Sequence, residues 1–518
     1  MTAVLGSNFS SPLRLLAIGG AATALSFSSL GFAGMAPAGA ATPNAPTVDT
    51  ALELSDPTGS DGYIVQLSRR ADADEVLAGE DFTDLTGPVF KGAVADLTPA
   101  EAAAVADEPG VVAVEPNRML SVHSDDVASP GEPLPMKSTR VNTQAATSAW
   151  GLDRIDQRSL PLDGDYSPTA TGSGVNVYVI DSGIDASNPE FSGRIGNGAY
   201  AYGSSAQDCD GHGTHVSGTI GSTSYGVAPG ATLHPVKTLD CDGSGSVEAT
   251  LNGIEWVANN APAGSVVNMS LGGEYSAVVN SAVAGLVSRG LAVAVASGND
   301  AANACGDSPG SEPAVLTVSA TNQSDNDASF SNYGPCVDIS APGEEILSVR
   351  LGGGSTIMSG TSMASPHVAG ALALVRQLNP SASGADIQQA LLAQGTANVI
   401  TFPYGQGGSP NLLLYVDHGT APVNPVNPVT PAAPAAVGSM KASVGKRKAK
   451  LMWSAVSGAT YYEVKVAKSS THRSWVTVTG TSTRVRGLSP GRKYTVKIFA
   501  GNSGGVSPTS AFVLRTRR

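Results

Sequence analysis

The pattern of apolar and polar positions changes twice along the chain, and its central part is the longest. From about residue 150 to 417, short apolar runs alternate with stretches of helical length. Uninterrupted apolar runs of this kind are typical of parallel strands that helices cover on both faces. The pattern predicts an α/β fold with a parallel sheet, whose sites form at the carboxyl ends of the strands. The predicted strands are residues 175–180, 233–238, 266–269, 291–296 and 315–319.

The region before this sheet predicts a small α+β domain over residues 60–123. Residues 62–67 and 111–115 have strand character. Between them, Thr98 and Pro99 predict a helix start, with Thr98 as the N-cap and Pro99 in the first helical position. The polar stretch that follows, up to residue 149, carries Gly and Pro and is predicted to be a linker open to proteolysis.

The region after the sheet predicts a second small domain, joined by an extended linker. Residues 418–434 are rich in Pro, Ala, Val and Thr, a composition typical of extended linkers. Residues 449–453, 461–466 and 494–499 alternate apolar and polar side chains, as half-buried strands do. The segment 435–518 is therefore expected to form an all-β sandwich.

The first 40 residues have the features of an export signal. Arg14 precedes an apolar, small-residue stretch that ends near Ala33, and Ala38 and Ala40 flank Gly39 in a small-x-small cleavage site. A membrane anchor is the alternative, but the Gly and Ser content and the cleavage site favour removal. The sequence predicts a secreted, extracellular protein without a later membrane span.

Composition and charge sharpen this division. The chain has 61 Gly among 518 residues, a net charge of −13 and only four Cys, which suggest two structural disulfides in an oxidising compartment. From Met440 onward, 16 Lys and Arg oppose the single acid Glu463, so this part carries +15 and the rest −28. The basic module is expected either to contact anionic polymers such as cell wall or polysaccharide, or only to keep the protein soluble. No nucleic-acid motif is present.

The stretch around Ser362 predicts a nucleophile at a helix start. Gly360 allows a turn before Ser362, small helix-compatible residues follow, and Pro366 is expected in the first helical turn. An exposed serine at the positive end of a helix suits a reaction with an oxyanion intermediate. A surface N-cap serine is the alternative that this stretch alone leaves open.

Two further stretches supply the partners that such a serine needs. Asp181 follows the predicted strand 175–180, and His212 lies between two glycines at a predicted helix start. A carboxylate can hold the imidazole, and the imidazole can take the serine proton. His215 suggests a zinc pair with His212, but the glutamate of a His-Glu-x-x-His helix is absent, so zinc is not expected.

The stretches around Asp181, His212 and Ser362 resemble the three signatures of subtilisin-like serine proteases, and residues 150–158 resemble the mature start in the proteinase K/aqualysin branch. The resemblance covers residues 62–417. It implies a catalytic domain over 142–417, with Asn299 as oxyanion donor, and an inhibitory propeptide over 60–123. Self-cleavage is expected between residues 124 and 150, with Asn142 or Thr143 as the mature start. The C-terminal domain resembles fibronectin type III, with Trp453 in its core and Tyr494 as its tyrosine corner.

The resemblance also implies how substrate, metal and disulfides are arranged. Asp307 stands where relatives commonly carry tyrosine, near the floor of the primary specificity pocket, and suggests a preference for Lys or Arg before the cut; the alternative is a carboxylate that caps a turn. The implied disulfides are Cys209–Cys241 and Cys305–Cys336. Substrate is expected to pair with Gly243, Ser244 and Gly245 on one edge and with Ser270, Leu271 and Gly272 on the other. Structural Ca²⁺ is expected at the carbonyls of Pro313 and Val315 with Asp338, and at Asp153, Asp156, Gln157, Asp163 and Asp165.

Three functions follow from these observations, and they differ in kind. The first is a monomeric, secreted, calcium-stabilised endopeptidase acting on proteins, with its own propeptide as inhibitor. The second is a secreted binding protein whose protease-like body is inactive, against which the three signatures and Asn299 argue. The third is a narrow processing protease, which would depend on Asp307 and the edges of the pocket.

Overall fold

The computed structural model describes residues 52–53, 62–122, 149–403, 405, 407–417, 434–456, 459, 461–467, 476–478, 481–502 and 505–518. The predicted signal (1–40), the stretch 124–148 with its expected cleavage points, and nearly all of the predicted linker (418–433) lie outside these residues. All described residues belong to one compact unit, Ala45–Arg518. Within them, no helix is both long and apolar enough to cross a bilayer.

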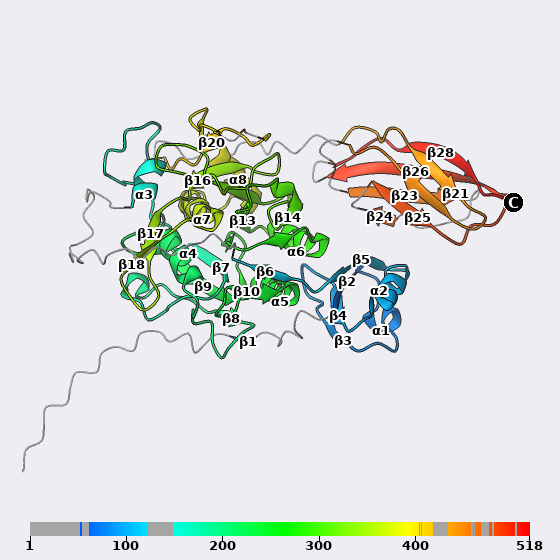
Figure 1. Ribbon diagram of the computed structural model, residues 1–518, viewed down its shortest axis with the longest axis horizontal. Helices are drawn as coiled ribbons and strands as arrows, with labels where there is room; N and C mark the ends of the chain where they lie inside the picture. Colours follow the sequence, from blue (N-terminus) through cyan, green and yellow to red (C-terminus); the bar gives the residue numbers. More distant parts are fainter. Residues whose placement is uncertain are drawn as a thin grey trace, which may run out of the picture. The chain divides into compact units, whose positions relative to one another are not determined.

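A large sheet dominates the central region, and its strands are parallel except for the pair β19–β20 at one edge (Figure 1). The parallel α/β prediction is confirmed, and each predicted strand lies within two residues of an observed one. In spatial order the strands are β1 (Leu52–Glu53), β8 (Ala199–Tyr200), β9 (Thr232–Lys237), β7 (Asn176–Asp181), β11 (Val266–Met269), β13 (Ala292–Ala296), β15 (Leu316–Thr321), β16 (Ile339–Pro342), β20 (Leu412–Leu413) and β19 (Thr396–Ala397).

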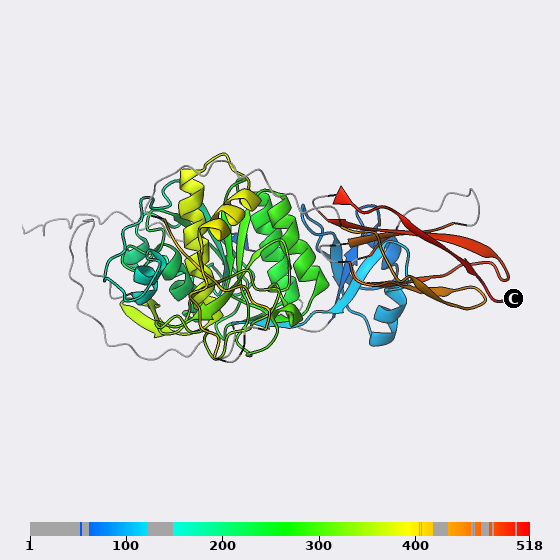
Figure 2. The same cartoon turned by 90° about the horizontal axis from the view of Figure 1, so that it is seen from above.

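Helices cover both faces of this sheet, as Figure 2 shows. In β7, Val177 and Val179 join one apolar cluster, whereas Tyr178 and Ile180 join another, because successive side chains of a strand point to opposite faces. The first cluster contains side chains of α4 (His212–Gly221), α7 (Thr361–Leu378) and α8 (Gly384–Gln394), and the second contains those of α5 (Val247–Asn260) and α6 (Ala277–Ser288). The short helix α3 (Trp150–Ile155) and the hairpin of β17 (Ile346–Val349) and β18 (Ser355–Met358) complete the first side.

Helix α7 begins at Thr361, and this start corrects one prediction. Gly360 is the N-cap in an extended conformation, with φ 163° and ψ 162°. Pro366 lies inside the helix rather than in its first turn. In a helix the carbonyl of Ser362 would accept a hydrogen bond from the N–H of residue 366, but proline has no N–H to donate. Ser270 Oγ donates to this carbonyl at 2.8 Å instead. A side chain from the end of β11 thus makes the proline tolerable.

The N-terminal unit is the predicted α+β domain. Its antiparallel sheet has the order β3-β4-β2-β5, and its own core includes Val65 and Leu97. Thr98 caps α2 with a complete capping box and Pro99 in the first position, as predicted. The elements are β2 (Tyr63–Leu67), α1 (Ala73–Val76), β3 (Phe82–Asp84), β4 (Gly92–Ala95), α2 (Pro99–Val105), β5 (Val111–Pro116) and β6 (Met119–Ser121).

The C-terminal region forms the predicted pair of antiparallel sheets around one core. Trp453 is 5% exposed within this core, and the hydroxyl of Tyr494 accepts a hydrogen bond from the Ser489 N–H at 2.7 Å. One sheet contains β21 (Lys441–Val444), β22 (Ala449–Met452) and β25 (Ser482–Val485). The other contains β23 (Tyr461–Ala467), β24 (Val476–Val478), β26 (Lys493–Asn502), β27 (Gly505–Val506) and β28 (Ser510–Arg515).

Candidate active site

Asp181 and His212 form a buried pair where β7 ends and α4 begins. Gly211, the N-cap of α4, has φ 112°, a conformation that glycine adopts without strain. The Nδ1 atom of His212 donates to Asp181 Oδ1 at 2.8 Å, and the Ser182 N–H donates to the same oxygen at 2.7 Å. This hydrogen bond places the ring proton on Nδ1, so Nε2 is the atom that can accept a proton.

Ser362 is the second residue of α7, near the positive end of the helix. Its Oγ donates to the carbonyl of Ser270 at 3.2 Å. Helix α7 packs against α4, so Ser362, in the first turn of α7, and His212, the first residue of α4, lie on neighbouring helices. The expectation that Ser362 is exposed is wrong: the side chain is fully buried, because the end of β11 packs on the first turn of α7.

Asn299 presents an oriented amide beside this helix start. Its Oδ1 accepts from the N–H of Thr361 at 2.9 Å and from Thr361 Oγ1 at 2.8 Å. Its Nδ2 is buried and has no hydrogen-bond partner among the described residues. A buried donor without a partner costs free energy unless a ligand uses it, so this amide has the geometry of a preformed anion donor.

Sequence reasoning missed the side chains that hold this arrangement in place. Thr361 Oγ1 also accepts a hydrogen bond from the Gly298 N–H at 3.1 Å, so this one side chain holds both Gly298 and Asn299. Asn268 donates to Ser270 Oγ at 2.9 Å and accepts from Ser365 Oγ at 2.8 Å, which ties β11 to α7. Their positions inside or beside the sequence motifs are the signal that could have found them.

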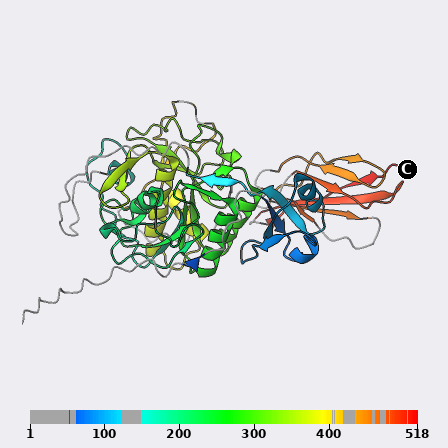
Figure 3. The same ribbon diagram turned by 60° about the horizontal axis from the view of Figure 1, so that its bottom comes forward.

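The two predicted substrate edges lie on either side of a segment of the chain itself. Strand β6 runs antiparallel to β10 (Ser244–Ser246), with Gly245 opposite Leu120. Figure 3 shows β6 as the cyan strand that lies along the green central region. On the other side, Ser121 and Gly272 exchange two backbone hydrogen bonds of 3.1 Å. The Val122 N–H donates to the carbonyl of Gly243 at 2.9 Å. Gly243, Ser244 and Gly245 on one edge and Gly272 on the other thus pair with an extended segment of the chain itself.

The N-terminal unit also contacts helices α5 and α6 through polar groups. Glu115 accepts from Ser276 Oγ at 2.7 Å and from the Ala277 N–H at 2.9 Å, and so caps the start of α6. Asn117 accepts from the Glu248 N–H at 3.0 Å. Glu255 of α5 accepts from the backbone N–H groups of Val89 and Phe90. These contacts hold the unit against α5 and α6, while β6 pairs with the two backbone edges.

Asp307 lies beside the residues that carry the oriented amide. It begins β14 (Asp307–Ser308), which pairs with β12 (Gly273–Glu274) just beyond the Gly272 edge. Its Oδ2 accepts from Asn332 Nδ2 at 2.6 Å, and a Cβ atom on Gly298 would lie 3.1 Å from the same oxygen. Burial, together with the nearby charge of Asp300, raises the pKa of Asp307 to about 6.

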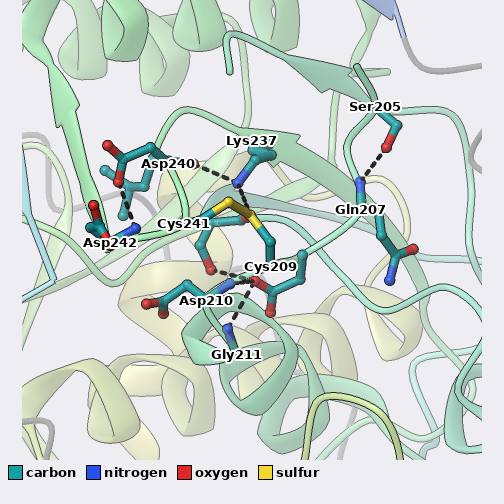
Figure 4. Close-up of a disulfide and its surroundings, with 12 residues drawn as sticks. Ser205, Gln207, Cys209, Asp210, Gly211, Lys237, Asp240, Cys241 and Asp242 are labelled. Atoms are coloured by element: carbon teal, nitrogen blue, oxygen red, sulfur yellow. Dashed lines mark hydrogen bonds between the residues drawn. A yellow bond between two sulfur atoms is a disulfide. The ribbon is translucent and has the colours of Figure 1, made fainter. Parts of the chain in front are cut away.

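Both predicted disulfides are present, and each flanks part of the site. Cys209–Cys241 has a Cα–Cα separation of 5.0 Å and joins the loop before His212 to the loop before Gly243, as Figure 4 shows. The buried Lys237 donates to the carbonyls of Ser182 and Leu239 beside this bridge. Cys305–Cys336 has a Cα–Cα separation of 5.3 Å. It encloses the stretch that carries Asp307 and Asn332.

The predicted calcium ligands provide oxygen donors in two places. Asp153 and Asp156 are almost fully buried, and Asp153 accepts hydrogen bonds from the N–H groups of Asp163 and Gly164. Asp338 is half-buried and accepts a hydrogen bond from the Thr317 N–H at 2.9 Å. Thr317 follows the predicted carbonyl ligands Pro313 and Val315 in the chain. These hard oxygen donors suit Ca²⁺ in kind. In the described ranges, however, no three His, Cys, Asp or Glu side chains converge as metal ligands.

The zinc alternative for His212 and His215 receives no support from the geometry. His215 is fully buried, and its Nε2 lies within hydrogen-bond distance of the carbonyl of Ile346 at 3.0 Å. Burial and the neighbouring His212 lower the pKa of His215 to about 3, so the ring is neutral. His215 therefore acts as a structural side chain that links α4 to β17.

Comparisons with known proteins agree with this geometry. Residues 172–407 match the model of the subtilase family, and residues 433–514 match that of the fibronectin type III domain. An extracellular serine proteinase of Thermus sp. (strain Rt41A) is 53% identical to this chain. The match covers 52% of this chain and 66% of that relative's length. The subtilisin-like serine protease AsES of Sarocladium strictum is 46% identical over 53% of this chain and 71% of the relative. A cold-adapted subtilisin-like serine proteinase of known structure is 44% identical, with a TM-score of 0.51 over 52% of this chain and 99% of its own. The chain belongs to the subtilase family.

Proposed function

We propose that the protein is a secreted serine endopeptidase that hydrolyses peptide bonds of proteins through an acyl-enzyme on Ser362. The buried Nδ2 of Asn299, fixed by Thr361 and without a partner among the described residues, is the observation that carries this proposal. An inactive binding protein would have no use for an oriented, unsatisfied donor beside a buried serine, because such a donor destabilises the fold.

The mechanism uses four residues. His212 Nε2 takes the proton of Ser362 Oγ as the oxygen attacks the carbonyl carbon, and later gives it to the leaving amine. Asp181 holds the ring tautomer through its 2.8 Å hydrogen bond and stabilises the imidazolium. Asn299 Nδ2 and the Ser362 N–H, which lies in the first turn of α7, donate to the developing oxyanion. Water then hydrolyses the acyl-enzyme by the same proton transfers in reverse.

Substrate would bind as an added strand between the two backbone edges, which favours broad recognition of extended chains. The Asp307 carboxylate beside Gly298 would then select a Lys or Arg side chain before the cut. The alternative, a carboxylate that only accepts from Asn332, predicts no such selectivity.

The N-terminal unit would act as an intramolecular inhibitor, because β6 takes the position of a substrate strand.

Calcium would be structural: the Asp153–Asp165 loop and the Asp338 site would hold it, and its charge would offset the burial of the carboxylates. Addition of a chelator is expected to lower the Tm by several degrees and excess Ca²⁺ to restore it; an unchanged Tm would contradict calcium binding. The basic sandwich, with its +15 charge, would contact anionic polymers outside the cell.

A serine-directed covalent inhibitor tests the activity. Mass spectrometry of the processed protein should show stoichiometric label on Ser362 and loss of protein hydrolysis, with neither label nor hydrolysis in Ser362→Ala. Absence of label in a folded protein would favour the binding-protein alternative. A peptide-library cleavage profile then separates a broad endopeptidase from a narrow processing one.

A further inference from the structure

Three segments of the C-terminal sandwich meet at one end of the domain. They are the loop 445–448 between β21 and β22, the turn 487–493 that leads into β26, and the tail 515–518, which begins with the last residue of β28. The Leu488 N–H donates to the carbonyl of Arg447 at 3.0 Å, and the Arg517 N–H donates to the carbonyl of Gly445 at 3.1 Å. Figure 1 marks the C-terminus at this end. Backbone hydrogen bonds thus hold the three segments side by side.

These segments, which we call the basic end, are densely charged and contain no acidic residue. They hold eight of the 16 Lys and Arg residues from Met440 onward, and all eight are exposed. None of the eight forms an ion pair with any residue in the described part of the chain. The eight are Lys446, Arg447, Lys448, Arg492, Lys493, Arg515, Arg517 and Arg518. The basic end is therefore a patch of positive charge that the domain itself does not neutralise.

The fold gains nothing from this arrangement. Lys493 and Arg515 lie directly opposite each other in the β26–β28 pair, where like charges destabilise a sheet. The domain's single acid, Glu463, pairs with Phe499, six positions along β26 from Lys493 and so about 20 Å away. Charge that served solubility alone would be better spread over the surface, because neighbouring cations repel one another. The gathering of eight cations at one end therefore favours an anionic partner.

The side chains at the basic end indicate the chemistry of this partner. Five of the eight cations are Arg, whose planar fork fits the oxygens of a phosphate group with two hydrogen bonds. The one aromatic residue that adjoins these segments in the chain, Tyr494, is 3% exposed, so it offers no ring on which a base could stack. A polymer without bases that carries a phosphate in each repeat fits such a surface best.

We propose that the basic end binds an extracellular polymer whose backbone consists of phosphodiesters, with the chemistry of poly(glycerol phosphate). The inference rests on the proposed contact of the sandwich with anionic polymers. It locates that contact on three adjoining segments instead of spreading it over the whole +15 domain, and it names the charged group that the arginines recognise. The catalytic domain would thereby be held where such a polymer is present.

The test measures how a fluorescently labelled poly(glycerol phosphate) binds the full chain with Ser362→Ala, so that no proteolysis accompanies the titration. Arg447→Gln, Arg492→Gln and Arg517→Gln together should weaken binding at least about tenfold. They should also make the slope of log K against log salt shallower by about two, because fewer counterions are released. All three side chains are exposed, so the substitutions leave the core of the domain unchanged.

A matched triple variant removes the same charge elsewhere on the domain. Lys441→Gln, Arg484→Gln and Lys497→Gln replace exposed side chains on strands of both sheets, and should change binding by less than about twofold because salt screens distant charges. Equal losses in the two triple variants would mean that net charge alone attracts the polymer. This inference would then fail, while the proposed contact of the sandwich with anionic polymers would stand. If the chain with Ser362→Ala alone does not bind the polymer, both fail.

Two further measurements define the partner and the scope of the effect. Polygalacturonate, whose charges are carboxylates, and single-stranded DNA should both bind more weakly at equal charge concentration; tighter binding of either overturns the assignment to a phosphodiester polymer without bases. With Ser362 restored, the arginine triple variant should hydrolyse a small soluble peptide at the normal rate. A loss of hydrolysis would mean that the substitutions disturb the whole protein, and would overturn the assignment of the binding loss to the basic end.

Discussion

The proposed reaction centre is buried and Asp307 beside it is half-buried, and the two are built differently. At the centre, Asn299 is fixed through two hydrogen bonds to Thr361, and Asp181 receives hydrogen bonds from His212 and Ser182. Asp307, by contrast, accepts one side-chain hydrogen bond, from Asn332, and burial and the charge of Asp300 raise its pKa to about 6.

The difference shows which part of the site is preorganised and which part responds to conditions. Fixed dipoles need no rearrangement as charge develops, so the centre is suited to transition-state stabilisation. A carboxyl group with a pKa near 6 changes charge in a common pH range, so the proposed selection of substrates by Asp307 would depend on pH. Substitutions at the centre should therefore change kcat for all substrates, and substitutions in the pocket should change the ratio between substrates.

The largest effect is expected for Asn299→Ala. Loss of the oriented amide should reduce kcat by about 10²–10³-fold with little change in KM, the range found when one such donor is removed from subtilisin, a relative of this protein. Steady-state kinetics with one peptide measures it. Asn259→Ala, on the exposed side of α5, is the control and should retain full kcat. A large rise in KM with normal kcat would show that Asn299 binds ground-state substrate instead.

Removal of the Cys209–Cys241 bridge by a double substitution to alanine should lower the free energy of unfolding by about 3–4 kcal/mol, as estimated from chain entropy for a loop of this length. Because the bridge flanks His212 and the Gly243 edge, kcat should fall too. The matched variant without Cys305–Cys336 should lose similar stability but change mainly the selectivity at Asp307. Denaturant unfolding measures the stability of the two variants, and kinetics with two substrates separates a change in kcat from a change in selectivity. Identical kinetic changes in both variants would contradict the proposal that one bridge supports His212 and the other supports Asp307.

Thr361→Val should have a smaller effect on the centre. It keeps the shape of the side chain but removes the hydroxyl that orients Asn299 and receives the Gly298 N–H. The kcat should fall about tenfold with KM unchanged, because the hydrogen bonds of the Thr361 hydroxyl that position Asn299 and Gly298 are lost. Thr361→Ser retains the hydroxyl and should restore most of the kcat. Equal loss in both variants would assign the effect to packing.

The smallest effect in free energy is expected at Asp307, and it depends on pH. The carboxyl is mostly neutral below pH 6 and charged above it, so the ratio of kcat/KM for Lys over Phe substrates should rise from pH 5 to pH 8. Titration of His212 cancels in this ratio, because it affects both substrates. Asp307→Asn preserves the shape and should make the ratio flat.

The same variant gives a stability test with a definite sign. Because the folded-state pKa is raised, ionisation of Asp307 destabilises the fold as pH rises from about 4 through 6. Asp307→Asn should therefore raise the Tm at pH 8 more than at pH 5. An equal change at both pH values would mean that the group does not titrate in this range.

The sequence by itself determined the architecture, because the apolar runs of a doubly covered parallel sheet and the alternating strands of the sandwich are local patterns. It also predicted roles for Asp181, His212 and Ser362 through motifs, and for Asn299 and both disulfide pairings through the family resemblance. These features depend on residues close together in the chain or on signatures of several residues.

Tertiary structure alone decided what links distant segments. Ser270 donates a hydrogen bond to the carbonyl that Pro366 leaves without a helical donor, although more than ninety residues separate Ser270 from that carbonyl. Thr361 orients Asn299 across a separation of 62 residues. The burial of Ser362 and the pairing of Met119–Val122 with the two backbone edges likewise arise from packing between segments. Such contacts leave no periodic trace in the sequence, because a short polar side chain has the same local pattern whether it faces water or holds a neighbouring strand.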